Sequence, residues 1–375
     1  MGTQNKNEFH EFESYQPSSE KLERVKGKKF ARINAWLKQH KKTVLLFVVA
    51  IAALLGAMLA YLFSTLQYGG GFSPFSPKPV AKIYSPLTGV EVSKEDSQRP
   101  VTAVMIENSP DARPQSGLKE CGVTFEAIAE AGITRFLCLY QEAQPELIGP
   151  VRSLRPYYLD WLAAFDPTVA HVGGSLNSLN EVRGGSYKDL DQYFNAETYW
   201  RTKDRRAPHN VYTNSKNLNA ANETKNYKQS VFTGFAHKDD TPSKAPDANT
   251  VTVPVSSALF NSSYQYSPNG NFYLRSQAGK PHLDREKGQV SPKVIVVIQT
   301  AHGNTIEDGA RETIQTIGTG KATVFQDGTV TSATWSKKSK TDQIHFLDVS
   351  GKEVPLNRGQ TWVTATPINN LVSWK

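Results

Sequence analysis

A single uninterrupted apolar run limits what this chain of 375 residues can fold into. Residues 44–63 form a stretch of twenty residues without a charged side chain, which Lys41, Lys42 and Thr43 precede. At about 1.5 Å per residue, a helix of this length reaches roughly 30 Å, the thickness of the hydrocarbon core of a bilayer. A buried helix of a soluble protein fits less well, because the run is long, uncharged and flanked by lysines. We therefore predict one transmembrane helix over residues 44–64.

The charges around this run predict its orientation. Residues 1–42 contain ten Lys or Arg against five Glu, whereas the rest of the chain carries 33 basic and 30 acidic residues. Basic segments beside a membrane helix stay in the cytoplasm. We expect residues 1–43 to be a flexible, basic cytosolic tail, within which residues 30–37 could form a short amphipathic helix, and everything after Gly69 to be extracytoplasmic. A cleaved signal peptide fits less well, because the run starts late and no small-residue cleavage site follows it.

Composition divides the rest of the chain into a tether and two folded parts. Residues 65–84 include a Gly- and Pro-rich stretch, and we expect them to form a linker that lifts the folded part off the membrane. Residues 236–250 are rich in Lys, Asp, Pro and Ser and form the best inner boundary. We predict one domain over residues 85–235 and another over residues 251–375. Since the folded part is nearly neutral overall, we expect no nucleic-acid partner for it.

The first of these domains has the pattern of a mixed α/β fold, and the second is β-rich. In the first, a buried strand at residues 101–106 and a hairpin around Ala131-Gly132 alternate with helical stretches. In the second, short runs with a period of two are separated by turns such as Asn269-Gly270. The predicted fold class is therefore α/β (α+β) for the N-terminal ectodomain, followed by a smaller β-rich C-terminal domain. Further strands are expected at 123–130, 133–141, 169–172, 251–255, 264–266, 271–275, 294–299, 322–326, 329–335, 344–347 and 361–365, and helices at 157–165, 176–182 and 217–227.

Two arginines between prolines mark the first candidate site. Arg152 and Arg155 lie between Pro150 and Pro156, in a stretch with too many helix breakers for a helix interior and too much charge for a core. Proline restricts the backbone, and guanidinium groups held rigidly can recognise a carboxylate or a phosphate. The alternative is that the arginines pair with nearby Asp or Glu residues and pin a loop. Both interpretations stay open.

Two further motifs predict polar groups that belong to a site. The turn Gly173-Gly174-Ser175 follows a predicted strand and precedes a predicted helix, so its backbone N–H groups could seat an anion, although plain turns use the same residues. Pro208 constrains the backbone ahead of His209 and Asn210. A histidine beside an asparagine suits a site, but a loop histidine that only caps a carbonyl group is the more common arrangement.

Several motifs follow one another in a fixed order along the ectodomain. They are Asn108-Ser-Pro-Asp-Ala-Arg-Pro-Gln-Ser-Gly-Leu, residues 126–136, Gly149-Pro-Val-Arg-Ser-Leu-Arg-Pro-Tyr, His171-Val-Gly-Gly-Ser, Ala207-Pro-His-Asn-Val-Tyr-Thr, and residues 320–364 with Trp335 and Gly359-Gln-Thr-Trp362. From about Ser85 to the C-terminus, this combination resembles the YerB-like family of bacterial lipoproteins. The resemblance implies a two-domain cell-surface protein of undefined activity. Positions that match the polar motifs of the family are Arg113, Glu126, Arg135, Arg152, Arg155, His171, His209 and Asn210.

This chain departs from the family in its anchor. It has no lipobox cysteine, and we expect the transmembrane helix to take over that role with the same topology. Its only cysteines, Cys121 and Cys138, lie outside the membrane, where a disulfide can persist. The predicted hairpin places Cys138 opposite a residue near Phe125, so a bridge between the two cysteines would require a bend.

The sequence carries no familiar catalytic or metal-binding motif. Nucleophile motifs of the Gly-x-Ser-x-Gly or Ser-x-x-Lys type are not convincing, and no His-Glu-x-x-His or Cys-x-x-Cys pair is present. We therefore expect no metal site and no cofactor. His282 and Asp284 could be ligands, but pairing within a β-turn is the more ordinary explanation.

Three functions remain open for the polar residues. The first, which we favour, is a binding or scaffold module that grips an anionic cell-envelope polymer or an envelope protein. The second is an envelope hydrolase or transferase for a phosphodiester or a glycan, with His209 or His171 as general base, Glu126 as a second acid/base and arginines that stabilise negative charge. The third is a buried polar network that only fixes the fold. The residues expected to bind in the first case are Arg113, Arg152, Arg155, Gly173, Gly174, Ser175 and Asn210.

Overall fold

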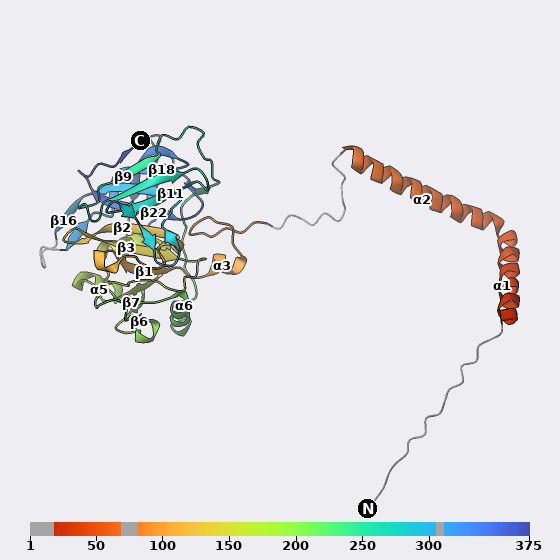
Figure 1. Ribbon diagram of the computed structural model, residues 1–375, viewed down its shortest axis with the longest axis horizontal. Helices are drawn as coiled ribbons and strands as arrows, with labels where there is room; N and C mark the ends of the chain where they lie inside the picture. The colour runs from red at the N-terminus through yellow and green to blue at the C-terminus, as the bar shows by residue number, and fades with distance from the viewer. Residues whose placement is uncertain (1–18, 69–80, 305–310) are drawn as a thin grey trace, which may run out of the picture. The chain divides into compact units, whose positions relative to one another are not determined.

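The computed structural model describes residues 19–68, 81–304 and 311–375 (Figure 1). The chain forms two units, Met1–Val80 and Ala81–Lys375. The first eighteen residues of the expected cytosolic tail and residues 69–80 of the expected linker lie outside the described residues.

In the first unit, the described residues 19–68 form two helices, α1 (Ser19–Gln39) and α2 (Lys41–Tyr68). Helix α2 covers the predicted transmembrane segment, and its stretch Lys41–Ser64 is long and apolar enough to cross a membrane. The expected flexible tail is helical over α1, which extends the short helix considered for residues 30–37 in both directions.

A ten-stranded mixed sheet forms the centre of the second unit, in the order β20-β19-β18-β15-β22-β2-β3-β1-β4-β5. Five of its strands come from the first half of the unit: β1 (Thr102–Glu107), β2 (Val123–Glu130), β3 (Ile133–Tyr140), β4 (Thr168–His171) and β5 (Lys188–Asp191). The other five come from the second half: β15 (Val294–Thr300), β18 (Gly318–Gln326), β19 (Thr329–Lys337), β20 (His345–Leu347) and β22 (Thr361–Pro367). The halves join where β2 and β22 run parallel, with residues 123–126 opposite 361–364. The expected inner boundary at residues 236–250 thus lies between the two halves of one sheet.

The two faces of this sheet are covered by different layers, because successive side chains of a strand point to opposite faces. On one face, α4 (Pro156–Leu162) and α5 (Leu176–Val182) contribute Tyr157, Trp161 and Val182 to a core that contains Met105. On the other face, α6 (Ser215–Thr224) contributes Leu218 to a second core. A five-stranded sheet with the order β12-β11-β10-β9-β23 supplies a third core. Its strands are β9 (Thr250–Val253), β10 (Ser262–Ser267), β11 (Phe272–Gln277), β12 (Lys280–Pro281) and β23 (Ser373–Trp374).

The remaining elements are short. They are α3 (Lys94–Gln98), β6 (Trp200–Arg201), β7 (Val211–Tyr212), β8 (His237–Lys238), β13 (Leu283–Asp284), β14 (Gly288–Gln289), β16 (His302–Asn304), β17 (Glu312–Ile314) and β21 (Leu356–Asn357), with single 3-10 turns at Pro110–Ala112, Leu118–Glu120, Ala163–Phe165 and Ala196–Thr198. The predicted fold class, a mixed α/β part followed by a β-rich part, is confirmed. The β2–β3 hairpin also turns at Ala131 and Gly132, both with positive φ, as predicted.

Residues 149–155 enter the sheet where β1 and β4 separate. The two strands pair in parallel only up to Val104 and Ala170. Beyond that point the backbone N–H of Arg152 donates to the carbonyl of Met105 (2.9 Å), and the carbonyl of Arg152 accepts from the N–H of Val172 (3.1 Å). The space between diverging carboxyl ends of parallel strands is where open α/β sheets bind ligands. The main chain therefore places Arg152 at that position.

The cysteines are free thiols in this fold, and both are buried. The hydroxyl of Thr124 donates to the sulfur of Cys121 at 3.2 Å and lies 3.9 Å from that of Cys138. Burial, together with the neighbouring Cys121, raises the pKa of Cys138 well above its usual value. The thiolate is the reactive form, so both burial and protonation protect Cys138.

We predict that a maleimide labels neither cysteine in the native full-length protein and labels both after unfolding without reductant. Mass spectrometry before and after denaturation measures the number of adducts. An unfolded protein that is labelled only after reduction would carry a disulfide and would contradict this assignment.

Candidate functional site

Four side chains meet at the carboxyl end of β1, and we call them the Glu107 cluster: Glu107, Ser109, Arg152 and His209. The Oε1 atom of Glu107 accepts hydrogen bonds from Nδ1 of His209 (2.8 Å) and from the hydroxyl of Ser109 (2.8 Å). The Nε atom of Arg152 lies 3.3 Å from the same oxygen. The Oε2 atom of Glu107 is buried and has no hydrogen-bond partner among the described residues. One oxygen of this buried carboxylate, Oε1, thus contacts three side chains, whereas Oε2 contacts none among the described residues.

Three chain segments bring the cluster together. Glu107 is the last residue of β1, Arg152 belongs to the segment between β1 and β4, and His209 precedes β7. The N–H of Val151 donates to the carbonyl of Val211 (2.7 Å), which ties the His209 loop to the Arg152 segment. Asn210 braces this loop, since its side chain accepts from Arg201 and donates to the carbonyls at positions 202 and 205. Asn210 therefore supports His209 and uses its own polar atoms within the loop.

His209 and Arg152 both reach the surface. Their side chains are 21% and 25% exposed, whereas Glu107 is almost completely buried. The carboxylate can only accept, so Nδ1 of His209 carries a proton and Nε2 is the nitrogen left for other contacts. Nε2 lies 3.9 Å from the exposed carboxylate of Asp111. Within the described residues, the Nη atoms of Arg152 have no hydrogen-bond or ion-pair partner.

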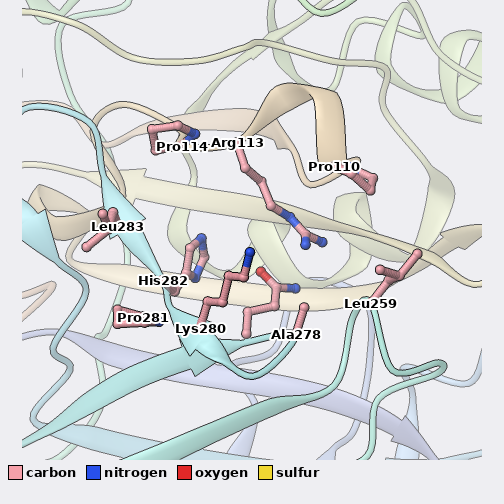
Figure 2. Close-up of a pocket in the computed structure, with 10 residues that line it drawn as sticks. Pro110, Arg113, Pro114, Leu259, Ala278, Lys280, Pro281, His282 and Leu283 are labelled. Atoms are coloured by element: carbon pink, nitrogen blue, oxygen red, sulfur yellow. The ribbon is translucent and has the colours of Figure 1, made fainter.

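Arg113 lies in a different place, in a pocket of about 440 Å³ that we call the Arg113 pocket (Figure 2). Asn108 holds the guanidinium through its side-chain oxygen (3.1 Å) and its carbonyl (2.9 Å), and the ring of Phe260 lies 5.2 Å from it. Lys280 is the second cation of the pocket, and none of the lining residues is acidic. The lining residues are Pro110, Arg113, Pro114, Leu259, Gln277, Ala278, Lys280, Pro281, His282 and Leu283.

Burial, followed by the charge of Arg275, lowers the pKa of Arg113 to about 10. The side chain therefore remains positively charged at neutral pH. A partly desolvated cation is weakly screened by solvent, so it attracts an anion more strongly than an exposed one.

Arg155 is engaged inside the protein. It donates to Oε2 of Glu130 at 2.8 Å, and Arg135 donates to Oε1 of the same carboxylate at 2.6 Å. Burial opposes ionisation of Glu130, but the two arginines outweigh it and lower the pKa of this carboxyl. Arg155 thus forms an internal ion pair that fixes its loop. This was the alternative to ligand binding in the interpretation of the arginine motif.

His171 and the Gly173-Gly174-Ser175 turn form another internal network. His171 is fully buried and contacts the carboxylate of Asp189 (2.9 Å) and the carbonyl of Gly173 (2.8 Å). The N–H of Gly173 donates to Asp191 (3.0 Å), and the N–H of Ser175 donates to the carbonyl of Leu154 (3.2 Å). These donors of the predicted anion seat are therefore already used within the chain.

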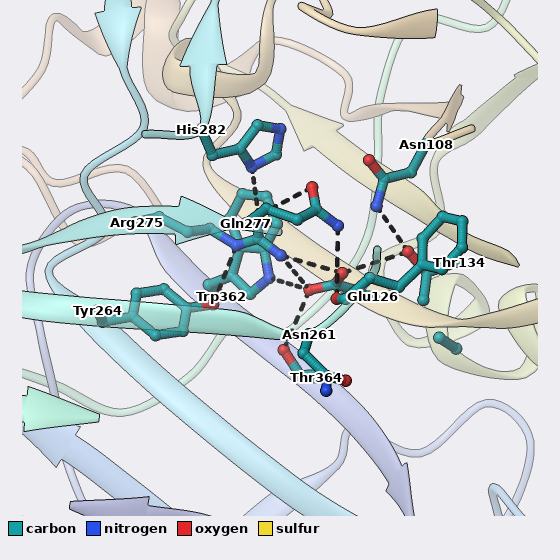
Figure 3. A network of polar contacts seen from close by, with 12 residues as sticks. Asn108, Glu126, Thr134, Asn261, Tyr264, Arg275, Gln277, His282, Trp362 and Thr364 are labelled. Atoms are coloured by element: carbon teal, nitrogen blue, oxygen red, sulfur yellow. Dashed lines mark hydrogen bonds and ion pairs between the residues drawn. The ribbon is translucent and has the colours of Figure 1, made fainter. Parts of the chain in front are cut away.

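Glu126 is also closed off, in a buried network that joins the two halves of the sheet (Figure 3). Both of its oxygens accept from Nη2 of Arg275, at 3.0 and 2.9 Å. The indole N–H of Trp362 donates to Oε2 at 2.9 Å, and the guanidinium of Arg275 lies 4.6 Å from the indole ring. Glu126 and Arg275 are both completely buried, so this carboxylate lacks the access that an acid/base role requires.

His282 extends this network toward the Arg113 pocket. Its Nε2–H donates to the side-chain oxygen of Gln115 (3.1 Å), so Nδ1 is the acceptor for the neighbouring Arg275. Burial, followed by the charges of Arg275 and Arg113, lowers the pKa of His282 well below its usual value. His282 is therefore a neutral member of the wall of the pocket.

Comparison with known proteins places this arrangement in a family. Two family models match, the N-terminal domain of a protein of unknown function (DUF3048) over residues 87–228 and the corresponding C-terminal domain over residues 251–363. The chain belongs to the DUF3048 family. The protein "Putative lipoprotein YerB" of Bacillus subtilis (strain 168) is 32% identical to this DUF3048 protein over 296 residues, which are 78% of this chain and 88% of YerB. The crystal structure of the YerB protein from Bacillus subtilis matches with a TM-score of 0.70 and 30% identity, over 78% of this chain and all of that structure. The resemblance to YerB is thereby confirmed.

The candidate residues of this DUF3048 protein do not all lie in one cleft. The structure brings His209 and Arg152 together and places Arg113 in a separate pocket. Sequence reasoning missed Glu107, Lys280 and Arg275. The signal for Glu107 was present, because it is the one charged residue of β1 and ends that strand, and open α/β sheets bind ligands at the carboxyl ends of their strands. The partner of Glu126 gave no local signal, since Arg275 is 149 positions away.

We predict that Glu126→Gln lowers the free energy of unfolding by about 3–5 kcal/mol, because it leaves the buried charge of Arg275 without a partner. Unfolding by urea, followed by tryptophan fluorescence of the full-length protein in detergent, measures the change. Glu91→Gln is the matched control: it removes the same charge from an exposed pair with Lys82 at 2.6 Å. We expect little change there, and equal stability of the two variants would contradict the role of Glu126.

Proposed function

We propose that this DUF3048 protein is anchored by α2 in the cell membrane and binds an anionic ligand of the cell envelope through the Arg113 pocket. The observation that carries this proposal is the charge of the pocket, which two cations and no acidic residue line. A guanidinium that Asn108 orients and that is still protonated at neutral pH suits a phosphate or a carboxylate.

The walls of the pocket narrow the class of ligand. Apolar side chains of three prolines and two leucines surround the cations, at positions 110, 114, 259, 281 and 283. Small-molecule sites commonly combine apolar walls with a few oriented polar groups. The ligand that fits best therefore carries an anionic group on an apolar or polyol scaffold. An envelope protein that presents such a group remains within this proposal.

We predict that phenyl phosphate binds the full-length protein in detergent more tightly than inorganic phosphate, because only the former contacts the apolar walls. Arg113→Met should weaken binding of phenyl phosphate about tenfold, the effect of losing a charge-assisted hydrogen bond of about 1.5 kcal/mol. Lys280→Met should weaken it several-fold, and Lys280→Glu should abolish it. Isothermal titration calorimetry measures each affinity.

Lys352→Met is the control for a general loss of positive charge, because Lys352 is exposed and does not line the pocket. Arg113 also supports Asn108, so the Lys280 variants separate loss of binding from loss of folding. Unchanged affinity in Lys280→Glu would overturn the assignment of the pocket. Benzoate as a second probe distinguishes a carboxylate site from a phosphate site.

The topology belongs to the same proposal. We propose that residues 1–43 stay in the cytoplasm, that residues 44–64 cross the membrane, and that residues 65–84 tether an extracytoplasmic part with regions 85–235 and 251–375 joined by residues 236–250. The basic charge of the N-terminal segment supports this orientation. The name of the relative, "Putative lipoprotein YerB", supports a membrane-associated envelope protein in general.

We predict that a membrane-impermeant maleimide labels Val349→Cys on intact cells, because Val349 is 95% exposed on the folded unit. Asn5→Cys should be labelled only after the cells are permeabilised. The wild-type chain, whose two cysteines are buried, gives the background. The reverse pattern of labelling would overturn the topology without affecting the Arg113 pocket.

A further inference from the structure

We propose that the Glu107 cluster is a catalytic centre in which His209 is the general base and Arg152 binds the phosphoryl group of a phosphodiester. This inference is independent of the Arg113 pocket. It rests on three functional groups from separate segments that meet where β1 and β4 diverge.

The orientation of His209 suits a general base. Its Nδ1–H is held by Glu107 at 2.8 Å, so the ring is fixed. The lone pair is then on Nε2, which lies 3.9 Å from the exposed carboxylate of Asp111, in a side chain that is 21% exposed. A carboxylate on one ring nitrogen orients the imidazole and stabilises the imidazolium that forms when the other nitrogen takes a proton. Glu107 is thus a positioning residue for His209, which is the group that touches the substrate.

Ser109 is not in position to be the nucleophile. Ser109 lies 3.3 Å from Nδ1 of His209, the same nitrogen that Glu107 contacts, and donates its own proton to Glu107. A serine nucleophile would have to contact Nε2 instead, as in a catalytic triad. The nucleophile is therefore a molecule that reaches Nε2 from solvent, and water is the simplest choice.

Arg152 supplies the positive charge of the cluster. Its Nε faces Glu107, its side chain is 25% exposed, and its two Nη atoms have no partner among the described residues. Such a fork fits two non-bridging oxygens of a phosphodiester. The same contact becomes stronger as negative charge develops on these oxygens during attack.

The step balances without a further reactant. The oxygen of water forms a bond to phosphorus while Nε2 of His209 takes one of its protons. The bond between phosphorus and the leaving oxygen breaks, and the imidazolium returns that proton to the leaving alkoxide. One phosphodiester and one water give one phosphomonoester and one alcohol, and Arg152 remains unchanged.

A second histidine–glutamate pair provides an internal control. Nδ1 of His345 lies 2.9 Å from Oε1 of Glu353, which is nearly the geometry of His209 and Glu107. Both residues of that pair are substantially exposed, and no arginine contacts them among the described ion pairs. If a histidine–carboxylate contact alone were sufficient for catalysis, loss of either histidine would lower the rate of hydrolysis equally.

The experiment measures hydrolysis of two probes, bis(4-nitrophenyl) phosphate and poly(glycerol phosphate), by the full-length protein in detergent. We expect the wild type to release 4-nitrophenolate, and phosphomonoester ends from the polymer. His209→Ala should lower kcat about 100-fold or more, the usual contribution of a general base. Glu107→Gln should lower kcat with little change in KM, and Arg152→Ala should lower kcat and raise KM, with partial recovery in Arg152→Lys.

Two measurements separate catalysis from a merely structural effect. Added imidazole should restore activity to His209→Gly, since the free base can occupy the vacated position. His345→Ala and Glu353→Gln should retain wild-type rates. The proposal is overturned if the wild type hydrolyses neither probe, if His209→Ala keeps its rate, or if the His345 variant loses as much activity as the His209 variant.

Discussion

The two halves of the folded unit meet around one buried charge, Glu126, whose ion-pair partner lies in the other half. Glu126 points from β2 into an interior where an unpaired carboxylate would be strongly destabilising, and Arg275 on β11 is its partner from the other half. Trp362 on β22 donates to the same carboxylate, and β22 is also the strand that pairs with β2. Backbone hydrogen bonds and the contacts of the buried charge thus both hold β2 beside β22. This explains why two regions of the sequence build one continuous sheet.

Main-chain pairing, rather than ion pairing, positions the Glu107 cluster. The segment that carries Arg152 bonds to Met105 on one side and to Val172 on the other, so the place of this arginine is fixed before its side chain makes any contact. Its neighbour in the motif, Arg155, uses its guanidinium on Glu130 instead. The motif therefore combines Arg155, which anchors the segment, with Arg152, whose Nη atoms have no partner among the described residues.

Local patterns in the sequence were sufficient for most of the fold, because the periodicity of apolar side chains is a property of each element. The β2–β3 hairpin and helix α5 lie at the residues expected from this periodicity and from the glycine turns. Contacts between distant segments were not visible in the same way. Glu126 and Glu107 are both glutamates at buried strand positions, and each could be an acid/base candidate. Their neighbours in the fold differ: Glu126 pairs with the buried Arg275, and Glu107 contacts the partly exposed His209 and Arg152. For the same reason the sequence indicated Arg152 and His209 separately and could not show that Glu107 joins them.

The two cationic sites have different chemistry but share one scaffold, the backbone from Glu107 to Pro114. Glu107 holds His209, the adjacent Asn108 holds Arg113, and Arg205 from the His209 loop donates to the carbonyl of Pro114 (2.5 Å). In the Glu107 cluster a carboxylate offsets part of the positive charge of Arg152, which favours proton transfer over tight retention of an anion. In the Arg113 pocket no acidic residue offsets the charge of the two cations, which favours retention. These charges favour binding of an anion in the Arg113 pocket and proton transfer at the Glu107 cluster. The short segment from Glu107 to Pro114 fixes the two sites relative to each other.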